Sequence, residues 1–255
     1  MDRTKLKNLI RRIAPLIGIA VFITVWAIAA AVVNDVILLP SPTQSVKAFF
    51  VLMVSPTFLR VVSATLLRAG GGFVLSLASA IICTIFSLLS KVVERALSPL
   101  IVIVRAVPTM SVILLMLLWI NSDVNPALVG ALISFPVLYS ALMGSARGID
   151  ENLIEMSKVY KVPTLKKVTS LYIPCMVPMF SQQCASTASL NLKVVISGEV
   201  LASTAVSMGR EMNLAAKVYF ETPTLFAWTA VAVIFSFLGE MIIKGLFRLM
   251  PGGKS

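Results

Sequence analysis

Glu155-Met156-Ser157 is followed, after a short basic link, by Leu171-Tyr172-Ile173-Pro174. Both motifs belong to a polar, charged stretch that lies between two long apolar ones. Backbone and charges at membrane depth are costly, so a membrane protein keeps such a segment where a partner in water contacts it. The stretch therefore predicts a membrane protein that crosses the bilayer several times and exposes one segment for binding.

The charges of this segment predict a short helix from residue 151 to about residue 160. Asp150 can cap the helix, Glu151 falls in its first turn, and two lysines fall in its last turn, which suits the helix dipole. Apolar side chains recur on one face, at Ile149, Leu153, Met156 and Tyr160. This amphipathic helix suits either the groove of a partner protein or the surface of anionic lipid.

The rest of the chain is dominated by apolar residues, which make up 58% of 255 residues, against 13% charged residues. Runs long enough to cross a bilayer fall at about 13–33, 69–89, 97–119, 126–146, 171–192 and 224–246. The first run, of about 21 residues, is longer than the apolar part of a secretory signal, so we expect an uncleaved helix. The sequence predicts an all-α membrane protein that forms a single transmembrane domain over residues 1–255, with six transmembrane helices.

The formal charge of +11 does not indicate nucleic-acid binding, because no recognised motif gathers the basic residues on a water-facing surface. The positive-inside rule explains the charge better. With both termini in the cytoplasm, about 15 Lys and Arg residues lie on that side and about six on the other. The sequence thus predicts a multi-pass protein of the cytoplasmic (inner) membrane with both termini cytoplasmic.

The residues that usually carry catalysis or bind metals are scarce. There is no His, and Cys83, Cys175 and Cys184 lack the paired spacing of a metal site or a disulfide framework. Gly253-Lys254-Ser255 resembles the end of a phosphate-binding loop, but Arg248 stands where that loop requires Gly. We expect no metal, no cofactor and no enzymatic activity in this chain.

Several local features lie outside the charged segment. Leu39-Pro40-Ser41-Pro42-Thr43 breaks any helix, and we expect a short interfacial helix to follow, around residues 46–54. We expect residues 193–223 to form a short helix and loops. Small residues recur every fourth position at Gly72, Ser76, Ala80 and Thr84, and again at Ser140, Gly144 and Gly148, which predicts two faces for close helix packing.

The fifth predicted span is the most polar, with Ser181, Gln182, Gln183, Ser186, Thr187, Ser189 and Asn191. Such side chains line a water-filled path or hydrogen-bond between helices. Ser181, Gln182, Ser186 and Ser189 are our candidates for the path. Arg105, within the third span, needs a carbonyl or a carboxylate such as Glu199 or Glu240, and it suits either a structural ion pair or an anion site.

The charged segment resembles the "EAA" coupling loop of ABC-importer permeases. Glu155 stands for the Glu, Met156 and Ser157 for the two small residues, Lys161 for the Gly, and Leu171, Ile173 and Pro174 for the apolar ending. Three further stretches resemble the nitrate/taurine/sulfonate type in the same order: Leu38-Leu39-Pro40-Ser41-Pro42, Arg105-Ala106-Val107-Pro108 and Val194-Val195-Ile196-Ser197-Gly198-Glu199.

This resemblance implies a type I ABC-importer permease that forms a homodimer in the lipid membrane. Its partners would be a cytoplasmic ATP-binding cassette subunit and an external substrate-binding protein, with ATP hydrolysis in the cytoplasmic subunit. The residues implied in ATPase coupling are Glu151, Glu155, Met156, Ser157, Tyr160, Lys161 and Pro174. A left-handed backbone at Lys161 costs about 1 kcal/mol relative to Gly, whereas Pro163 can also end the helix.

Two other classes of membrane protein compete with this interpretation. A stand-alone secondary transporter or channel would place ionisable residues at the midplane and show inverted repeats, neither of which is evident. A membrane-embedded enzyme would need paired acids or a nucleophile with a base. The substrate stays open between nitrate, sulfonates such as taurine, bicarbonate-like anions and thiamine precursors.

Overall fold

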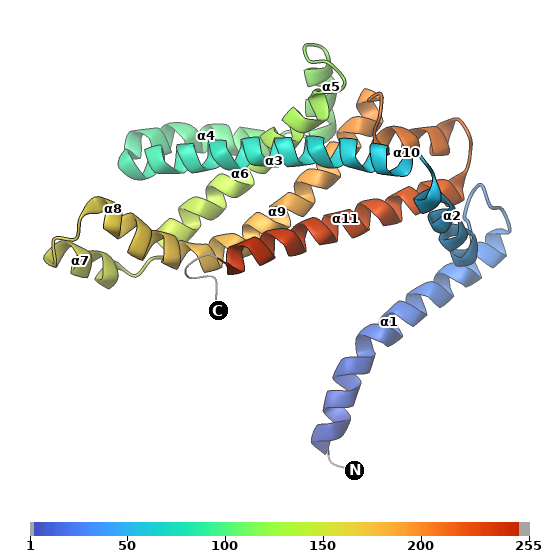
Figure 1. The fold of residues 1–255 in the computed structure, drawn as a ribbon, viewed down its shortest axis with the longest axis horizontal. Helices are drawn as coiled ribbons and strands as arrows, with labels where there is room; N and C mark the ends of the chain where they lie inside the picture. Colours follow the sequence, from blue (N-terminus) through green and yellow to red (C-terminus); the bar gives the residue numbers. More distant parts are fainter. Residues whose placement is uncertain (1–2, 250–255) are drawn as a thin grey trace. The chain divides into compact units, whose positions relative to one another are not determined.

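A computed structural model describes residues 3–249, and the side chains of residues 14–163 and 166–249. All regular elements of these residues are helical, so the predicted all-α class is confirmed (Figure 1). Gly253-Lys254-Ser255 lies outside the described residues. The helices are α1 (Arg3–Val33), α2 (Pro42–Val54), α3 (Phe58–Leu89), α4 (Lys91–Ala106), α5 (Thr109–Leu117), α6 (Asn125–Arg147), α7 (Glu151–Val159), α8 (Thr164–Lys167), the π-helical turn η1 (Val168–Tyr172), α9 (Ile173–Ala202), α10 (Met208–Lys217) and α11 (Thr222–Arg248).

Four of these helices are long and apolar enough to cross a membrane: Ala14–Val33 of α1, α3, α6 and α11. The span expected at 97–119 is broken, because α4 and α5 meet at a bend of 96°. Val107 is extended, and Pro108 cannot continue the helix. If this bent pair is one span, the structure offers five. Although α9 has 30 residues, its polar side chains keep it out of this group.

Two boundaries differ from the expectation. The second span does not begin at residue 69, because α3 starts at Phe58 and extends it by three turns. The fifth does not end at 192, because α9 continues to Ala202, where Ser203 adopts a left-handed conformation. No proline or glycine ends either helix at the predicted boundary. The apolar runs in the sequence covered only the part of each helix that has no charged side chain. Residues 58–68 and 193–202, which lay outside the predicted spans, are therefore helical.

One compact unit of the chain comprises the residues up to Phe58 together with Glu211–Val231. Aromatic contacts stabilise it: Trp26 stacks on Phe226 with ring centroids 5.4 Å apart, and Phe58 stacks on Trp228 at 6.0 Å. The Trp26 indole N–H also donates to the Pro40 carbonyl at 3.0 Å. Here the proline-rich entry leads into α2, as expected.

The start of α2 follows from its sequence. The Ser41 hydroxyl accepts the Gln44 N–H, and the Gln44 side chain accepts the Ser41 N–H at 2.8 Å, which is a complete capping box. Pro42 occupies the first turn, where its missing N–H has no helical partner to lose. The short helix expected around 46–54 is therefore present and begins four residues earlier.

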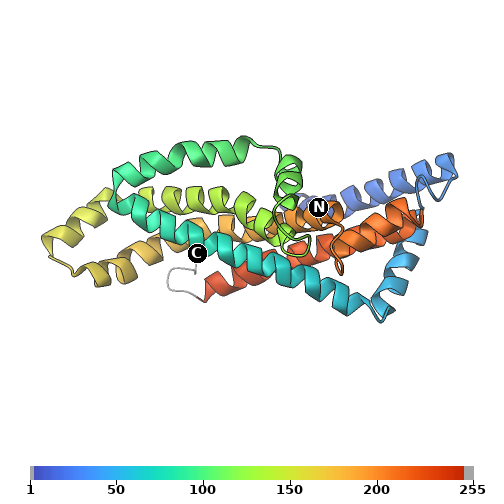
Figure 2. The ribbon, with the colours of Figure 1, turned by 90° about the horizontal axis from the view of Figure 1, so that it is seen from above.

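The second unit comprises Leu59–Arg210 and the residues from Ala232 onward. In it α6 and α9 pack along their length, and a core of apolar side chains fills the bundle around Leu138, Phe180 and Cys184 (Figures 1 and 2). The face predicted for close packing on α3 is confirmed. A Cβ on Gly72 would lie 2.4 Å from the Ala127 carbonyl oxygen of α6, so only Gly allows this approach.

The second predicted packing face, at Ser140, Gly144 and Gly148 on α6, behaves differently. A Cβ built on Gly144 would meet no atom within 4 Å. Ser140 and Gly144 instead line a cavity between α4 and α6. The prediction of close helix packing at these two positions was wrong, because small residues can line an open cavity as well as allow two helices to approach closely.

Candidate coupling segment and permeation path

The segment between α6 and α9 begins with a capped helix, as the sequence predicted. The Asp150 carboxylate accepts the Asn152 N–H at 2.9 Å, and α7 runs from Glu151 to Val159. Glu151 lies in the first turn and Lys158 in the last. The segment projects from one end of the second unit (Figure 1).

The turn that ends α7 has the hydrogen bonds of a Schellman motif. The Lys161 N–H donates to the Lys158 carbonyl at 3.0 Å, and the Val162 N–H donates to the Ser157 carbonyl at 3.1 Å. Lys161 has φ of 49°, the left-handed conformation that usually requires Gly. Lys161 thus takes the backbone conformation of the Gly in the resembling loop, and Pro163 follows it where the helix cannot continue.

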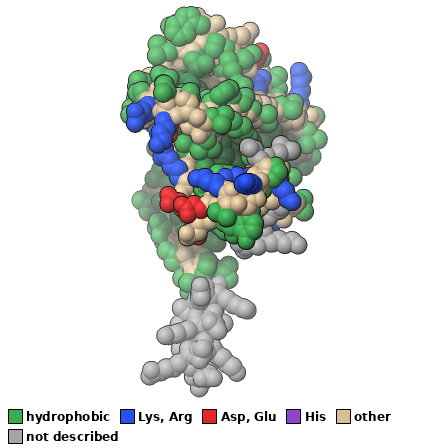
Figure 3. Space-filling model, turned by 90° about the vertical axis from the view of Figure 1, so that its left-hand side faces the viewer, with side chains coloured by type: hydrophobic (Ala, Val, Ile, Leu, Met, Phe, Trp, Pro, Cys, Tyr) green, Lys and Arg blue, Asp and Glu red, His purple; other side chains and the backbone are tan. Residues whose placement is uncertain are grey.

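The apolar stripe of α7 is largely exposed. Met156 is 52% exposed and Tyr160 is 75% exposed, and Val159, which the sequence analysis did not include, is 77% exposed. Ile149 is buried and therefore anchors the segment instead of joining the exposed surface. Lys and Arg side chains and a smaller acidic group surround this end of the unit (Figure 3). The result is an apolar surface with a charged rim.

The other predicted coupling residues differ in accessibility. The side chains of Glu151 and Glu155 are exposed, whereas Ser157 is buried and its hydroxyl donates to the Ile154 carbonyl at 2.6 Å. Pro174 lies in the first turn of α9. Residues 164–170 do not form a separate helix, because α8, η1 and α9 follow one another without a break.

The polar residues of α9 divide into two groups. Gln182 and Ser186 are exposed and lie one turn apart, and Lys193 and Ser197 continue this face. Ser181 is half-buried and donates to the Pro178 carbonyl, and Ser189 is buried. Of the four predicted path residues on α9, only Gln182 and Ser186 therefore face outward in this chain.

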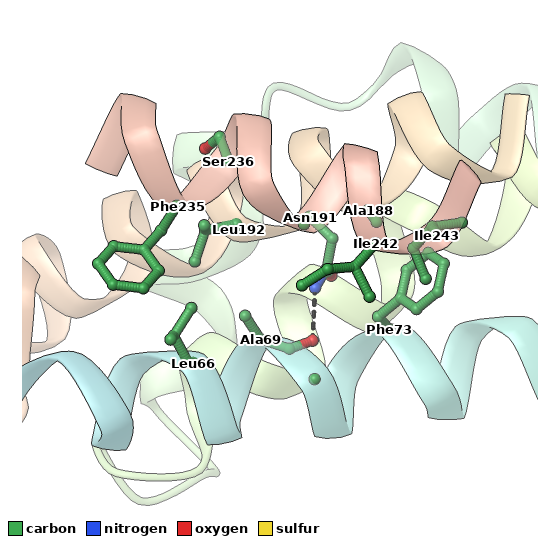
Figure 4. A pocket seen from close by; sticks show the side chains of 12 residues that line it. Leu66, Ala69, Phe73, Ala188, Asn191, Leu192, Phe235, Ser236, Ile242 and Ile243 are labelled. Carbon is green, nitrogen blue, oxygen red and sulfur yellow. Dashed lines mark hydrogen bonds between the residues drawn. The ribbon is translucent and has the colours of Figure 1, made fainter. Parts of the chain in front are cut away.

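Asn191 ties α9 to its neighbours. Its side-chain N–H donates to the Ala69 carbonyl of α3 at 2.7 Å (Figure 4). Its side-chain carbonyl accepts the Ser134 hydroxyl of α6 at 3.2 Å. The adjoining cavity, of about 190 Å³, is mostly lined by apolar side chains such as Phe73 and Ile242. Interhelical hydrogen bonding, one of the two interpretations of the polar cluster, holds for Asn191.

Arg105 forms neither of the ion pairs considered from the sequence. Its Nη2 donates to the Pro136 carbonyl at 2.9 Å and to the Ser140 hydroxyl at 2.8 Å. Glu199 pairs with Arg68, and Glu240 pairs with Lys244 one turn away on its own helix. Arg105 therefore donates to a backbone carbonyl and a hydroxyl, and both carboxylates form ion pairs with other residues.

Sequence reasoning missed a buried polar cluster around Glu199, whose side chain is fully buried. The Glu199 carboxylate accepts the Thr65 hydroxyl at 2.9 Å, the Arg68 Nη1 at 3.2 Å and the Gly209 N–H at 3.2 Å. Arg68 also donates to the carbonyls of Asp123 and Val206. This cluster joins α3 to the loops before α6 and after α9.

Known protein families and structures resemble this chain. Residues 72–250 match the family model described as "Binding-protein-dependent transport system inner membrane component". The chain belongs to this family. It is therefore an importer permease of the inner membrane, and the predicted permease function and all-α permease fold are confirmed.

Relatives with assigned names support the permease family over nearly the whole chain. The "Putative aliphatic sulfonates transport permease protein SsuC" of Bacillus subtilis (strain 168) is 25% identical over 231 residues, which is 90% of this permease and 83% of that protein. The "Formylaminopyrimidine transport permease protein ThiX" of Halalkalibacterium halodurans is 24% identical over 250 residues, 96% of this chain and 97% of that one.

Solved structures support the fold. A chain of a bacterial ABC transporter involved in the import of the acidic polysaccharide alginate matches with a TM-score of 0.61 and 15% identity, over 96% of this permease and 98% of that chain. A chain of the MetNI methionine ABC transporter, in an inward-facing conformation, matches with a TM-score of 0.60 and 15% identity, over 73% and 90%. The permease thus has the fold of ABC-importer membrane subunits.

Proposed function

We propose that two copies of this permease form the path of an ATP-driven importer, and that α7 transmits movement from a cytoplasmic ATP-binding cassette subunit. The observation that carries the proposal is the exposed apolar stripe of Met156, Val159 and Tyr160 on a capped, charged helix. Apolar side chains of this size in water gain free energy when a partner groove covers them. Aromatic anchors surrounded by charges are typical of interface hot spots.

The backbone offers a route for this movement. The Schellman turn at Lys161 fixes the angle between α7 and the residues that follow. From Thr164 the helical backbone continues through η1 into α9. A displacement of α7 by the ATPase would therefore move α9 along with it, because a packed helix shifts as a unit.

We propose that the exposed polar face of α9, with Gln182 and Ser186, contributes to the path in the dimer. Polar side chains that face outward in a membrane subunit need water or another subunit as a partner. Ser181 and Ser189 would support this face from within the bundle, and Arg105 would add a positive charge to the path.

The orientation proposed from the basic residues places both termini and α7 in the cytoplasm. An external binding protein would then deliver the solute from the opposite side. This chain would hydrolyse no ATP itself, since hydrolysis would take place in the cytoplasmic subunit. The names of relatives, which mention aliphatic sulfonates, formylaminopyrimidine and riboflavin, favour a small organic solute.

The test is co-purification of the permease with the ATPase subunit encoded beside it. We expect the double charge reversal E151K/E155K with Met156→Glu to lose the ATPase and to abolish ATP-dependent uptake. Glu221→Lys, an exposed charge reversal outside the segment, serves as the matched control and should keep both. If the triple variant retains the ATPase and normal uptake, α7 is not the coupling contact, whereas uptake that persists without the ATPase would indicate a secondary transporter or channel.

A further inference from the structure

The cavity between α4 and α6 has a volume of about 330 Å³. Its size falls at the lower end of the range for small-molecule sites. Its lining combines polar groups, namely Arg105, Ser140 and Ser98, with apolar side chains such as Ile101 and Met143. This combination fits a molecule with a charged head and a short apolar part.

The charge around the cavity is positive. Glu94, the carboxylate in its lining, is paired with Arg147 across the two helices. Arg105 has no carboxylate within ion-pair distance among residues 14–163 and 166–249, and its two partners are neutral oxygens. Arg105 is exposed in this chain, and a guanidinium without a carboxylate partner can donate charge-assisted hydrogen bonds to an anion beside it.

Donors of Arg105 remain for such an anion. Its two hydrogen bonds to described residues both use Nη2, which leaves the N–H groups of Nε and Nη1. The Ser140 hydroxyl accepts one of these bonds and can still donate its own proton. Gly144, one turn further along α6, keeps the floor open because no side chain fills it.

We propose that this cavity binds the oxyanion head of a small amphiphilic anion, such as a sulfonate or phosphate, with Arg105 and Ser140 as donors. The anion is either the transported solute or the headgroup of a phospholipid. The identification of the anion as the transported solute rests on the proposed function. Anion binding itself does not, because a binding assay needs neither the ATPase nor transport.

The experiment measures calorimetric binding of pentanesulfonate to the full-length permease in phosphatidylcholine nanodiscs, with pentanol as the uncharged probe. We expect Arg105→Gln to weaken pentanesulfonate binding about tenfold or more, because charge-assisted hydrogen bonds are lost. Arg95→Gln removes the same charge from an exposed position of α4 outside the cavity and should change the affinity less than about twofold.

A second variant covers the case in which Arg105→Gln fails to fold. Val102 lines the cavity but is 63% exposed, so Val102→Trp fills the space without removing a core contact. This variant keeps Arg105 and should abolish pentanesulfonate binding.

Phosphatidylglycerol in the nanodiscs distinguishes the two sources. If it weakens pentanesulfonate binding in the wild type but not in Arg105→Gln, the headgroup shares the site. If it has no effect, the ligand is the soluble anion. Both results support an anion site. The proposal would be overturned if pentanol bound as well as pentanesulfonate. It would also be overturned if the binding of pentanesulfonate and phosphatidylglycerol did not depend on Arg105 and Val102.

Discussion

Replacing Glu199 with Ala should destabilise the permease more than the loss of any exposed charge. The substitution removes the acceptor of the Thr65 hydroxyl, the Arg68 guanidinium and the Gly209 N–H at once. These donors belong to α3 and to the first turn of α10, so the loss also loosens the connection of both segments to α9.

The magnitude follows from burial. The Glu199 side chain is fully buried and that of Arg68 is 18% exposed. Removing one partner of a buried ion pair costs about 3–5 kcal/mol, because the other charge stays desolvated. Arg68 keeps the carbonyls of Asp123 and Val206, so we expect the lower end, about 3 kcal/mol.

Thermal unfolding of the purified permease measures the effect. At about 2–4 °C per kcal/mol for a chain of this size, Glu199→Ala should lower the Tm by about 6–12 °C. Asp123→Asn is the matched control, since this carboxylate also contacts Arg68 but is 50% exposed. It should cost less than about 1 kcal/mol. Equal Tm shifts in the two variants, or an unchanged Tm in Glu199→Ala, would refute the assignment of the cluster as a buried structural tie.

Three further predictions concern packing, the turn after α7 and the path. Gly72→Leu should cost about 1–3 kcal/mol in thermal unfolding, because its Cβ would meet the Ala127 carbonyl oxygen at 2.4 Å, whereas Gly71→Leu, with no atom within 4 Å, should leave the Tm nearly unchanged. Lys161→Gly should relieve about 1 kcal/mol of left-handed strain and increase hydrogen-exchange protection of the Val162 N–H, and slower exchange in Lys158→Gly as well would contradict this. Gln182→Leu should reduce uptake without changing the Tm because its side chain is exposed, whereas Asn191→Leu should lower the Tm, and normal uptake in Gln182→Leu would count against its role in the path.

Local signals in the sequence predicted local structure well. Ser41 and Gln44 form a capping box whose spacing is visible in the chain, and Asp150 caps α7 as expected. The left-handed turn was anticipated from the resemblance, although a Lys occupies it. Each of these features depends on residues within about four positions of one another, so the sequence contains all the partners.

Features that depend on distant residues were not predictable in the same way. Arg68 and Glu199 are separated by 131 positions, and no spacing rule connects them. For Arg105 the sequence left a carbonyl and a carboxylate open as partners, and only the fold selects the carbonyl of Pro136 and the hydroxyl of Ser140 on α6. The bend at Pro108 was signalled by the proline, but an average of hydropathy over the span hides a local break.

The most direct test of the account is photo-cross-linking from α7 in the assembled transporter. A benzophenone amino acid replaces Tyr160, which is 75% exposed, and, as the matched control, Tyr219, which is 61% exposed in the other unit. In native membranes that contain the ATPase subunit and the external binding protein, the account predicts an adduct to the ATPase from position 160 and none from position 219. An adduct of position 160 to the external binding protein, or no adduct to the ATPase, would contradict it.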